Sequence, residues 1–385
     1  MNRLRRVRDD ESGMSYVFIG LGLMAFLSAS TLAIDVGMLM VSRNQAQNAA
    51  DAGALAGAVA LFRDSFTDHT PTGPAVTSAI AAAQANLVAG QVASVTPEDV
   101  EFLMGPGGQQ NRVKVTVYRT TGRDNAVPTL VAKFFGMDTA DIWATATAEA
   151  TPANAMTCVK PFTIPDKWTE RQTPPWDPSD TYKAFDNQGN PLANPDVYIP
   201  ATEPGYTGYN QERERGVRLV LRSRTGTNIE PSMYFSYAIA DVTGASEYEW
   251  NIGNCNTHIM KWGELLLHEP GAMAGPTVSG IEQNIAKDPN AYWDDATNTI
   301  KNSAFSGGNQ SPRVFPIPLY DPVYYDSGTR NGRYADLKVA NWIGFFAESV
   351  QGAQIYGRII PIGGIYDVYS ESPAGVFPIA IRLVQ

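Results

Sequence analysis

The distribution of apolar and polar residues sets the N-terminal part of the chain apart. Residues 12–34 carry no charged side chain, and about 20 apolar residues suffice for a helix to cross a hydrocarbon core of roughly 30 Å. Residues 36–41 remain apolar without a break. A cleaved signal peptide has a shorter apolar region, of about 7–15 residues, that ends at a small-residue cleavage site. The pattern therefore predicts a retained transmembrane helix.

The helix is predicted to continue beyond the membrane. Residues 43–62 contain no proline and are rich in alanine, the strongest helix former. We expect one helix over residues 14–63, about 75 Å long at about 1.5 Å per residue.

Small residues recur every four positions along this helix and form two rows. The inner row is Ala25, Ala29, Ala33 and Gly37, and the outer row includes Ala46, Ala50, Gly53 and Gly57. Such rows let helices approach closely in lipid, so they predict packing against partner helices. Two alternatives stay open: alanine serves only as a helix former, or the chain's own globular part covers the outer row.

Asp35 is the one charge flanked by apolar residues on both sides within this helix. Carboxylates inside a membrane are costly and are often functional. A position near the outer end of the span equally allows an interfacial residue that reaches water. Both interpretations stay open.

The remaining pattern predicts an α+β fold. Helical spacing over residues 75–89 and 127–135, the latter ending at Gly136, alternates with strand patterns over 112–118 and 141–151. These elements predict an α+β unit over residues 64–155. Residues 156–385 are rich in Pro, Gly and aromatic residues and predict a β-rich domain with long loops. Its expected strands include residues 217–221, 232–240, 354–361 and 376–384.

Charge predicts the orientation of the helix. The net charge is −10, and the only dense cationic run is Arg3, Arg5, Arg6 and Arg8. Basic flanks stay in the cytoplasm, so residues 1–13 form a cytoplasmic leader and the rest lies across the membrane. No basic surface for nucleic acid is visible.

The two cysteines, Cys158 and Cys255, would then lie in an oxidising compartment. We expect them to form a disulfide, although two buried free thiols are an open alternative. The 97-residue separation would make such a cross-link worth roughly 4–5 kcal/mol in the chain-entropy model.

Motifs for chemistry are missing from the sequence. His69, His258 and His268 belong to no zinc motif, and no nucleophile elbow, phosphate-binding loop or dinucleotide fingerprint occurs. Carboxylate pairs such as Asp294 and Asp295 are read as loop charges. We therefore expect no enzyme, no cofactor, no metal and no small-molecule substrate.

The N-terminal region resembles TadG-like proteins of the tight-adherence (Flp) pilus system. The resemblance covers the basic leader, Glu11-Ser-Gly13, the span and residues 33–57. The residues that carry it are Asp35, Gly37, Gln47, Asn48, Ala49, Ala50, Asp51, Ala52, Ala54, Leu55, Ala56 and Gly57. Residues 158–168 are also similar to a segment of that group.

The resemblance implies a membrane-anchored component of pilus assembly that contacts other pilus-assembly or pilin-like proteins through its helix. It implies a bacterial inner-membrane protein with a cytoplasmic N-terminus, a pilin-like unit over residues 64–155 and its bulk in the periplasm. The alternatives are a minor pilin or tip adhesin at the cell surface and, in another class, a membrane-tethered periplasmic hydrolase.

Two positions depart from family patterns. Pilins cut by prepilin peptidase have glutamate five residues after the cleavage glycine, but Phe18 stands there after Gly13. The nearest match to the metal motif of a von Willebrand A domain is Asp177-Pro-Ser179-Asp-Thr181. This segment follows no strand pattern, and we read it as an exposed turn.

Overall fold

The computed structural model describes residues 12–64, 67–105, 108–186, 188–305, 309–329, 335–370 and 378–384. The leader expected to be cytoplasmic lies, up to residue 11, outside the described residues. The chain divides into two compact units. The helical unit comprises Met1–Glu149 and Arg382–Gln385, and the barrel unit comprises Ala150–Ile381.

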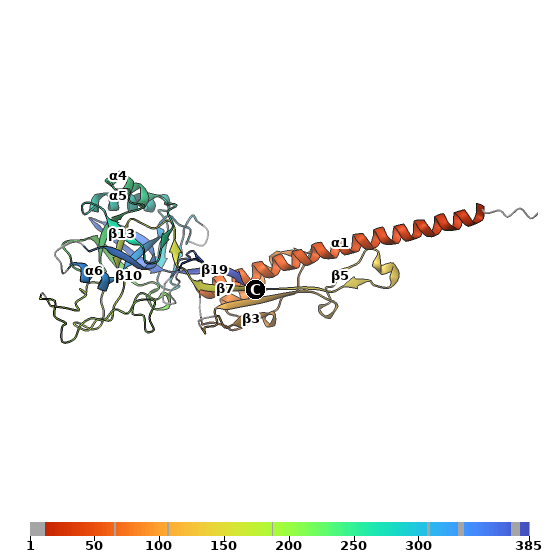
Figure 1. The fold of residues 1–385 in the computed structure, drawn as a ribbon, viewed down its shortest axis with the longest axis horizontal. Coiled ribbons are helices and arrows are strands. Elements are labelled where there is room, and N and C mark those ends of the chain that lie inside the picture. The colour runs from red at the N-terminus through yellow and green to blue at the C-terminus, as the bar shows by residue number, and fades with distance from the viewer. Residues whose placement is uncertain are drawn as a thin grey trace, which may run out of the picture. The chain divides into compact units, whose positions relative to one another are not determined.

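Helix α1 (Ser12–Arg63) is the backbone of the helical unit and runs far beyond the unit's sheet (Figure 1). Its 52 residues match the predicted single helix. The apolar side chains between Met14 and Leu32 are exposed, whereas Ala54 and Ala58 in the other half are fully buried. Of the helices in the described ranges, α1 alone is long and apolar enough to cross a membrane, by length and composition.

Helix α2 (Pro74–Ala85) packs along the second half of α1. It ends four residues earlier than predicted, because the chain turns into a short hairpin of β1 (Leu87–Val88) and β2 (Gln91–Val92). Gly90 has φ +75°, which suits the turn of such a hairpin.

A four-stranded sheet lies against the two helices, in the order β19-β7-β4-β3. Its strands are β3 (Val100–Leu103), β4 (Arg112–Arg119), β7 (Ile142–Pro152) and β19 (Ile379–Val384). The pairs β3–β4 and β4–β7 are antiparallel. Strands β4 and β7 agree with the alternation over residues 112–118 and 141–151. The 3-10 helix η1 (Pro97–Asp99) precedes β3, and η2 (Thr121–Arg123) follows β4.

Strand β19 corrects the predicted domain division. It was expected within the β-rich domain, but it pairs with β7 and its last residues belong to the helical unit. Sequence alternation identifies a strand without identifying its neighbour.

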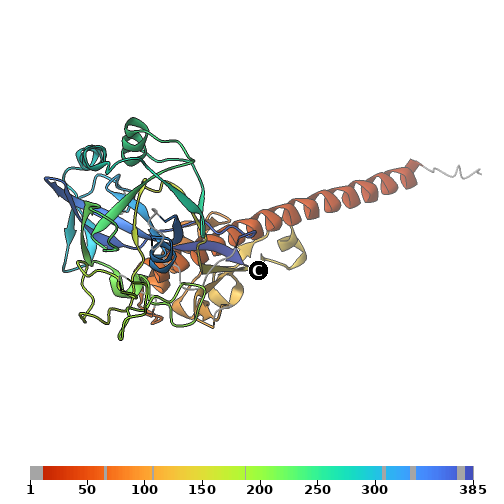
Figure 2. The same ribbon diagram turned by 60° about the vertical axis from the view of Figure 1, so that its left-hand side comes forward.

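The segment between β4 and β7 forms a second hairpin, which lies alongside α1 in both views (Figure 1, Figure 2). Strands β5 (Val127–Pro128) and β6 (Thr139–Ala140) pair in antiparallel fashion. Between them lies the 3-10 helix η3 (Ala132–Phe135), which ends at Gly136 with φ +82°. The expected helix over residues 127–135 is therefore wrong in its first half, because Val127 and Pro128 pair with β6 instead.

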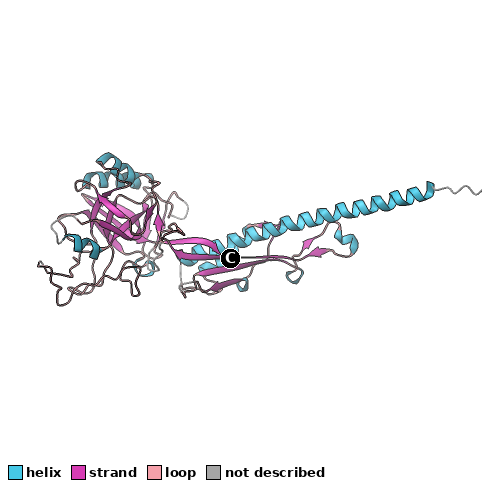
Figure 3. Ribbon diagram, viewed as in Figure 1, coloured by secondary structure: helices cyan, strands magenta, loops and turns pink. Residues whose placement is uncertain are grey.

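The barrel unit is built on a sheet that closes on itself (Figure 3). Its ring has the order β10-β18-β17-β16-β9-β11 and returns to β10, while β13 pairs with both β11 and β17. The strands are β9 (Phe162–Pro165), β10 (Arg218–Ser223), β11 (Met233–Ala238), β13 (Leu265–His268), β16 (Val314–Tyr320), β17 (Leu337–Gln351) and β18 (Gln354–Ile360). The predicted strands over residues 217–221, 232–240 and 354–361 correspond to β10, β11 and β18.

Strand β17 gave no alternating signal because it is buried on both sides. Phe345 belongs to the main core, whereas Phe346 packs with Trp293 and Ile300 in a second cluster. These two partners lie on a hairpin of β14 (Tyr292–Asp294) and β15 (Thr299–Lys301). A strand covered on both faces reads as a continuous apolar run.

Four helices and one further strand pair complete the barrel unit in the described ranges. The helices are α3 (Gln211–Glu214), α4 (Ala245–Gly253), α5 (Ala274–Lys287) and α6 (Pro322–Thr329). The strand pair is β8 (Ala155–Met156) with β12 (Met260–Lys261). Helices α4 and α5 pack together, and Gly280 of α5 allows close contact with Ile252 of α4.

Candidate functional site on the long helix

The inner row of small residues is not covered by the chain itself. Ala25, Ala29, Ala33 and Gly37 are all exposed. A Cβ atom added at Gly37 would meet nothing within 4 Å. This row is therefore open to contact with another helix.

The outer row has a different environment, which corrects the expected neighbour. A Cβ atom at Gly57 would lie 2.8 Å from Val113 Cγ1 and 3.1 Å from Ala79 Cβ, so β4 and α2 touch the helix there. At Gly53 it would lie 3.0 Å from Ala83 Cβ. Ala46 and Ala50 are fully buried. The outer row thus packs against the chain's own helix and sheet, the alternative left open above, because α2 offers an equally small-residue surface.

The polar residues beside the outer row also bind the helical unit. Gln45 Oε1 accepts a hydrogen bond from the Ala89 amide at 2.8 Å, in the β1–β2 turn. Gln47 Nε2 donates to Asp51 at 2.8 Å and to the Thr145 carbonyl at 3.2 Å. Gln45 therefore ties the helix to the β1–β2 turn, and Gln47 ties it to β7.

Asp35 is 2% exposed although the apolar residues around it on the helix are exposed. Its carboxylate accepts hydrogen bonds from three successive amides at the start of η3. The Leu130 amide donates to Oδ1 at 2.8 Å, and the Val131 and Ala132 amides donate to Oδ2 at 2.9 and 2.6 Å. Asp35 thus caps the first turn of η3 and ties the hairpin to α1.

The tip of this hairpin, residues 129–137, is unusually apolar for an exposed turn. Leu130, Phe134, Phe135 and Met137 are all more than half exposed. Val131, Phe134 and Phe135 face α1 across a cavity of about 410 Å³. The helix residues that line this cavity are Gly20, Leu23, Met24, Leu27 and Ser28.

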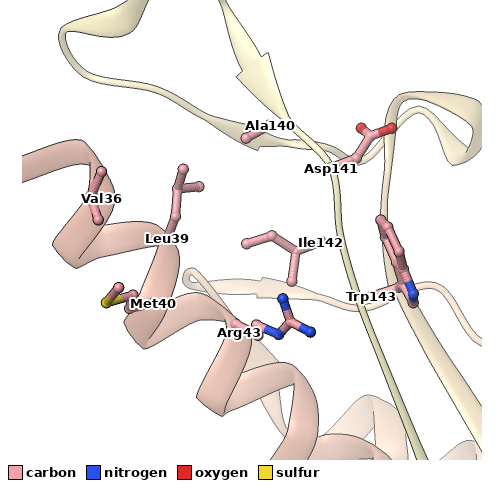
Figure 4. A pocket seen from close by; sticks show the side chains of 8 residues that line it. All are labelled: Val36, Leu39, Met40, Arg43, Ala140, Asp141, Ile142 and Trp143. Atoms are coloured by element: carbon pink, nitrogen blue, oxygen red, sulfur yellow. The ribbon is translucent and has the colours of Figure 1, made fainter. Parts of the chain in front are cut away.

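Nearer to the sheet, α1 and the chain that enters β7 enclose a groove of about 310 Å³ (Figure 4). Val36, Leu39 and Met40 form its helical wall, and Ile142 points toward Leu39 from the opposite side. At the end of the groove closer to the sheet lie Arg43 and Trp143. The groove is therefore apolar along α1, and Arg43, Asp141 and Trp143 also line it.

In the barrel unit the two cysteines form the expected disulfide, Cys158–Cys255. Nearby, Lys160 is buried, and burial lowers the pKa of its amine to about 7. The Lys160 amine donates to the Asn254 carbonyl at 2.8 Å. This arrangement holds the segment before β9 against the end of α4.

The histidines and the turn-like acidic motifs have structural roles. His69 stacks on Phe102, His258 lies 3.0 Å from Glu264, and the His268 Nε2 atom donates to the Ala335 carbonyl. Asp177 accepts hydrogen bonds from the amide and hydroxyl of Ser179, which makes an exposed turn as expected. Within the described ranges no three His, Cys, Asp or Glu side chains gather in a way that could hold a metal ion.

Asp166 is a buried carboxylate that sequence reasoning missed. It accepts hydrogen bonds from the hydroxyls of Tyr198 and Tyr206 at 3.1 and 2.6 Å and from the Tyr209 amide at 3.0 Å. Burial raises the pKa of Asp166 to about 6. In the sequence this aspartate and its tyrosine partners are about 30–40 residues apart. Such a separation does not indicate contact unless the fold is known.

One further polar recess lies at the end of β13. Arg224, His268 and Glu269 line a cavity of about 410 Å³, and Glu269 accepts a hydrogen bond from the Gly244 amide at 2.7 Å. Burial lowers the pKa of His268. Of the described residues, Gly226, Pro270, Gly271 and Ala272 complete the lining of this recess.

Comparison with known proteins identifies the helix. Neither a curated protein nor a solved structure matches the chain. Residues 13–60 match the Tad family model, which is described as Flp pilus-assembly, TadE/G-like. The match covers nearly all of α1, including Asp35 and both small-residue rows. Over the long helix the chain is therefore similar to the Tad domain of Flp pilus-assembly proteins, as the sequence resemblance indicated.

Proposed function

We propose that this chain is a membrane-anchored component of Flp pilus assembly and is not an enzyme. The observation that carries the proposal is the position of the Tad match. It falls on a helix whose residues 12–34 carry no charge and whose apolar side chains between Met14 and Leu32 are exposed and would otherwise face water. A hydrocarbon environment removes the cost of that exposure.

In this proposal α1 crosses the bacterial inner membrane once, with the arginine-rich leader in the cytoplasm and both units in the periplasm. The orientation is supported by the positive charge before the span. The disulfide in the barrel unit fits an oxidising compartment.

Partner contact is proposed for the inner row, Ala25 to Gly37, because this row is open and its small side chains allow two backbones to approach closely. The partners would be the helices of other pilus-assembly or pilin-like proteins. Incorporation as a minor pilin or tip adhesin is the alternative. Phe18 stands where pilins cut by prepilin peptidase have glutamate, which argues against such cleavage and against ordinary packing into a pilus shaft.

A combined topology and complementation experiment tests the proposal. A strain that lacks this protein should lose surface Flp pili, and a fusion with phosphatase after Gln385 should restore them and be active outside the cytoplasm. A fusion after Gly13 is the matched control and should be inactive. Phosphatase activity confined to the cytoplasm would overturn the orientation, and undiminished pili in the deletion strain would overturn the pilus role.

A further inference from the structure

We propose that the hairpin tip, residues 129–137, inserts into the periplasmic half of the lipid bilayer beside α1. The occupant of its apolar surface is lipid acyl chains. The inference rests on the proposed membrane span and gives the protein a second, non-helical contact with the membrane.

The depth of the tip follows from its contacts along α1. Asp35 holds the start of η3, and the tip faces the helix at Leu23 and Leu27. These positions lie 8–12 residues before Asp35, which is about 12–18 Å along a helix. The charge-free stretch from Ser12 to Ile34 surrounds them on both sides. A bilayer that covers this stretch of α1 therefore also covers the tip.

The side chains of the tip fit that position. Phe134 is 78% exposed, Phe135 68% and Met137 56%. Moving apolar surface from water into hydrocarbon is favourable by roughly 25 cal/mol for each Å². Exposed aromatic rings are therefore stabilised when lipid covers them. Clustering of such side chains at the end of a hairpin is typical of a surface that is covered, and the neighbouring apolar helix identifies lipid as the covering material.

The backbone of the tip is also prepared for a medium without water. Non-helical backbone is tolerated at membrane depth only where its polar groups find partners within the protein. Asp35 satisfies the three amides of residues 130–132. The Thr129 amide donates to the Asp138 carbonyl, and the Phe134 and Met137 amides donate to carbonyls of the tip itself. The buried Asp35 carboxylate, which accepts from three amides, thus allows the turn to enter lipid.

The charged residues at and beside the tip are Lys133 and the exposed Asp138. The Lys133 amine lies 5.5 Å from the centre of the Phe134 ring, and the long apolar stem of lysine lets the amine extend away from the apolar surface toward the headgroups.

Spin-label accessibility tests the proposal on the full chain in vesicles of phosphatidylethanolamine and phosphatidylglycerol. Both native cysteines are in the disulfide, so an added cysteine is the single labelling site. Labels at Phe134→Cys and Phe135→Cys are compared with Leu27→Cys in the span and Tyr369→Cys, which is 95% exposed in the barrel unit. Neither tip variant removes a buried side chain.

The expected result is that the two tip labels resemble the Leu27 label. All three should be accessible to oxygen and at least about tenfold less accessible than the Tyr369 label to a polar nickel chelate, which hydrocarbon excludes. Tip labels open to the chelate while the Leu27 label is protected would overturn the insertion and leave the span intact. A Leu27 label open to the chelate would overturn the span itself. Tip labels inaccessible to both oxygen and the chelate would show that a protein partner, not lipid, covers the tip. This result would also overturn the proposal.

A second experiment tests the role of Asp35. Asp35→Asn replaces one of the two accepting oxygens by an NH2 group, which places donor hydrogens against at least one of the loop amides that Asp35 holds. The Phe134 label should therefore move toward water and its chelate accessibility should rise. Asp51→Asn is the matched control, because Asp51 lies on the same helix and bonds Gln47 there, away from the tip. An unchanged Phe134 label in the Asp35→Asn variant would show that the carboxylate does not hold the tip in lipid.

Discussion

At the scale of single residues, Asp166 makes the stability of the barrel unit depend on pH. Burial raises its pKa from 3.8 to about 6, so the folded state keeps the proton at a pH where the unfolded state has lost it. Stability should therefore fall as the pH rises from about 4 to about 6, by up to about 3 kcal/mol for this group.

Urea unfolding followed by tryptophan fluorescence at pH 4 and pH 7 measures this effect. Other carboxylates, such as Asp288 and Asp367, have lowered pKa values and contribute in the opposite direction. The comparison with Asp166→Asn isolates the group, because the variant cannot titrate at this position. The same pH dependence in both proteins would contradict the prediction.

At the scale of elements, the two halves of α1 should tolerate large side chains differently. At Gly57 a side chain would meet Val113 and Ala79, and overpacking of this kind costs about 1–3 kcal/mol. Gly57→Leu should therefore lower the thermal stability and the cellular level of the protein.

Gly37→Leu is the matched control on the same helix, because Gly37 has open space around it. This variant should keep the protein level and should instead reduce cross-linking of α1 to partner helices. Equal protein levels for Gly57→Leu and Gly37→Leu would contradict the packing seen at Gly57. If Gly37→Leu does not reduce cross-linking, the inner row does not contact partner helices.

At the scale of the whole molecule, the disulfide should act on one unit only. Cys158 and Cys255 are 97 residues apart and both lie in the barrel unit. Closing a loop of this length is worth roughly 4–5 kcal/mol in the chain-entropy model. In a variant with both cysteines changed to serine, the free energy of unfolding of the barrel unit should fall by up to this amount. The free energy of unfolding of the helical unit should stay the same.

Hydrogen exchange resolved by segment is the suitable measurement, because it reports the opening of each unit separately. Amides of β16 and β17 should exchange faster in the double variant, and amides of β4 should not. Equal acceleration in β4 would mean that the two units unfold as one.

Much of the helical unit was accessible to sequence reasoning, because its signals are local. The length of α1 follows from a charge-free stretch that runs into an alanine-rich one, and β4 and β7 follow from alternation of apolar and polar residues. The disulfide followed from a count of two cysteines. In the barrel unit, β17 escaped prediction because it is buried on both faces and shows no alternation.

The sequence by itself determined the long helix, its similarity to the Tad family model and the residue types along its faces, since these depend on neighbours within a few turns. Only the tertiary structure decided what each face meets. The partners of Asp35 lie 95–97 residues away, the outer row is covered by α2 and β4, and β19 joins a sheet that begins nearly 280 residues earlier. Such contacts depend on how distant segments fold back on each other, and no local pattern of residues records that choice.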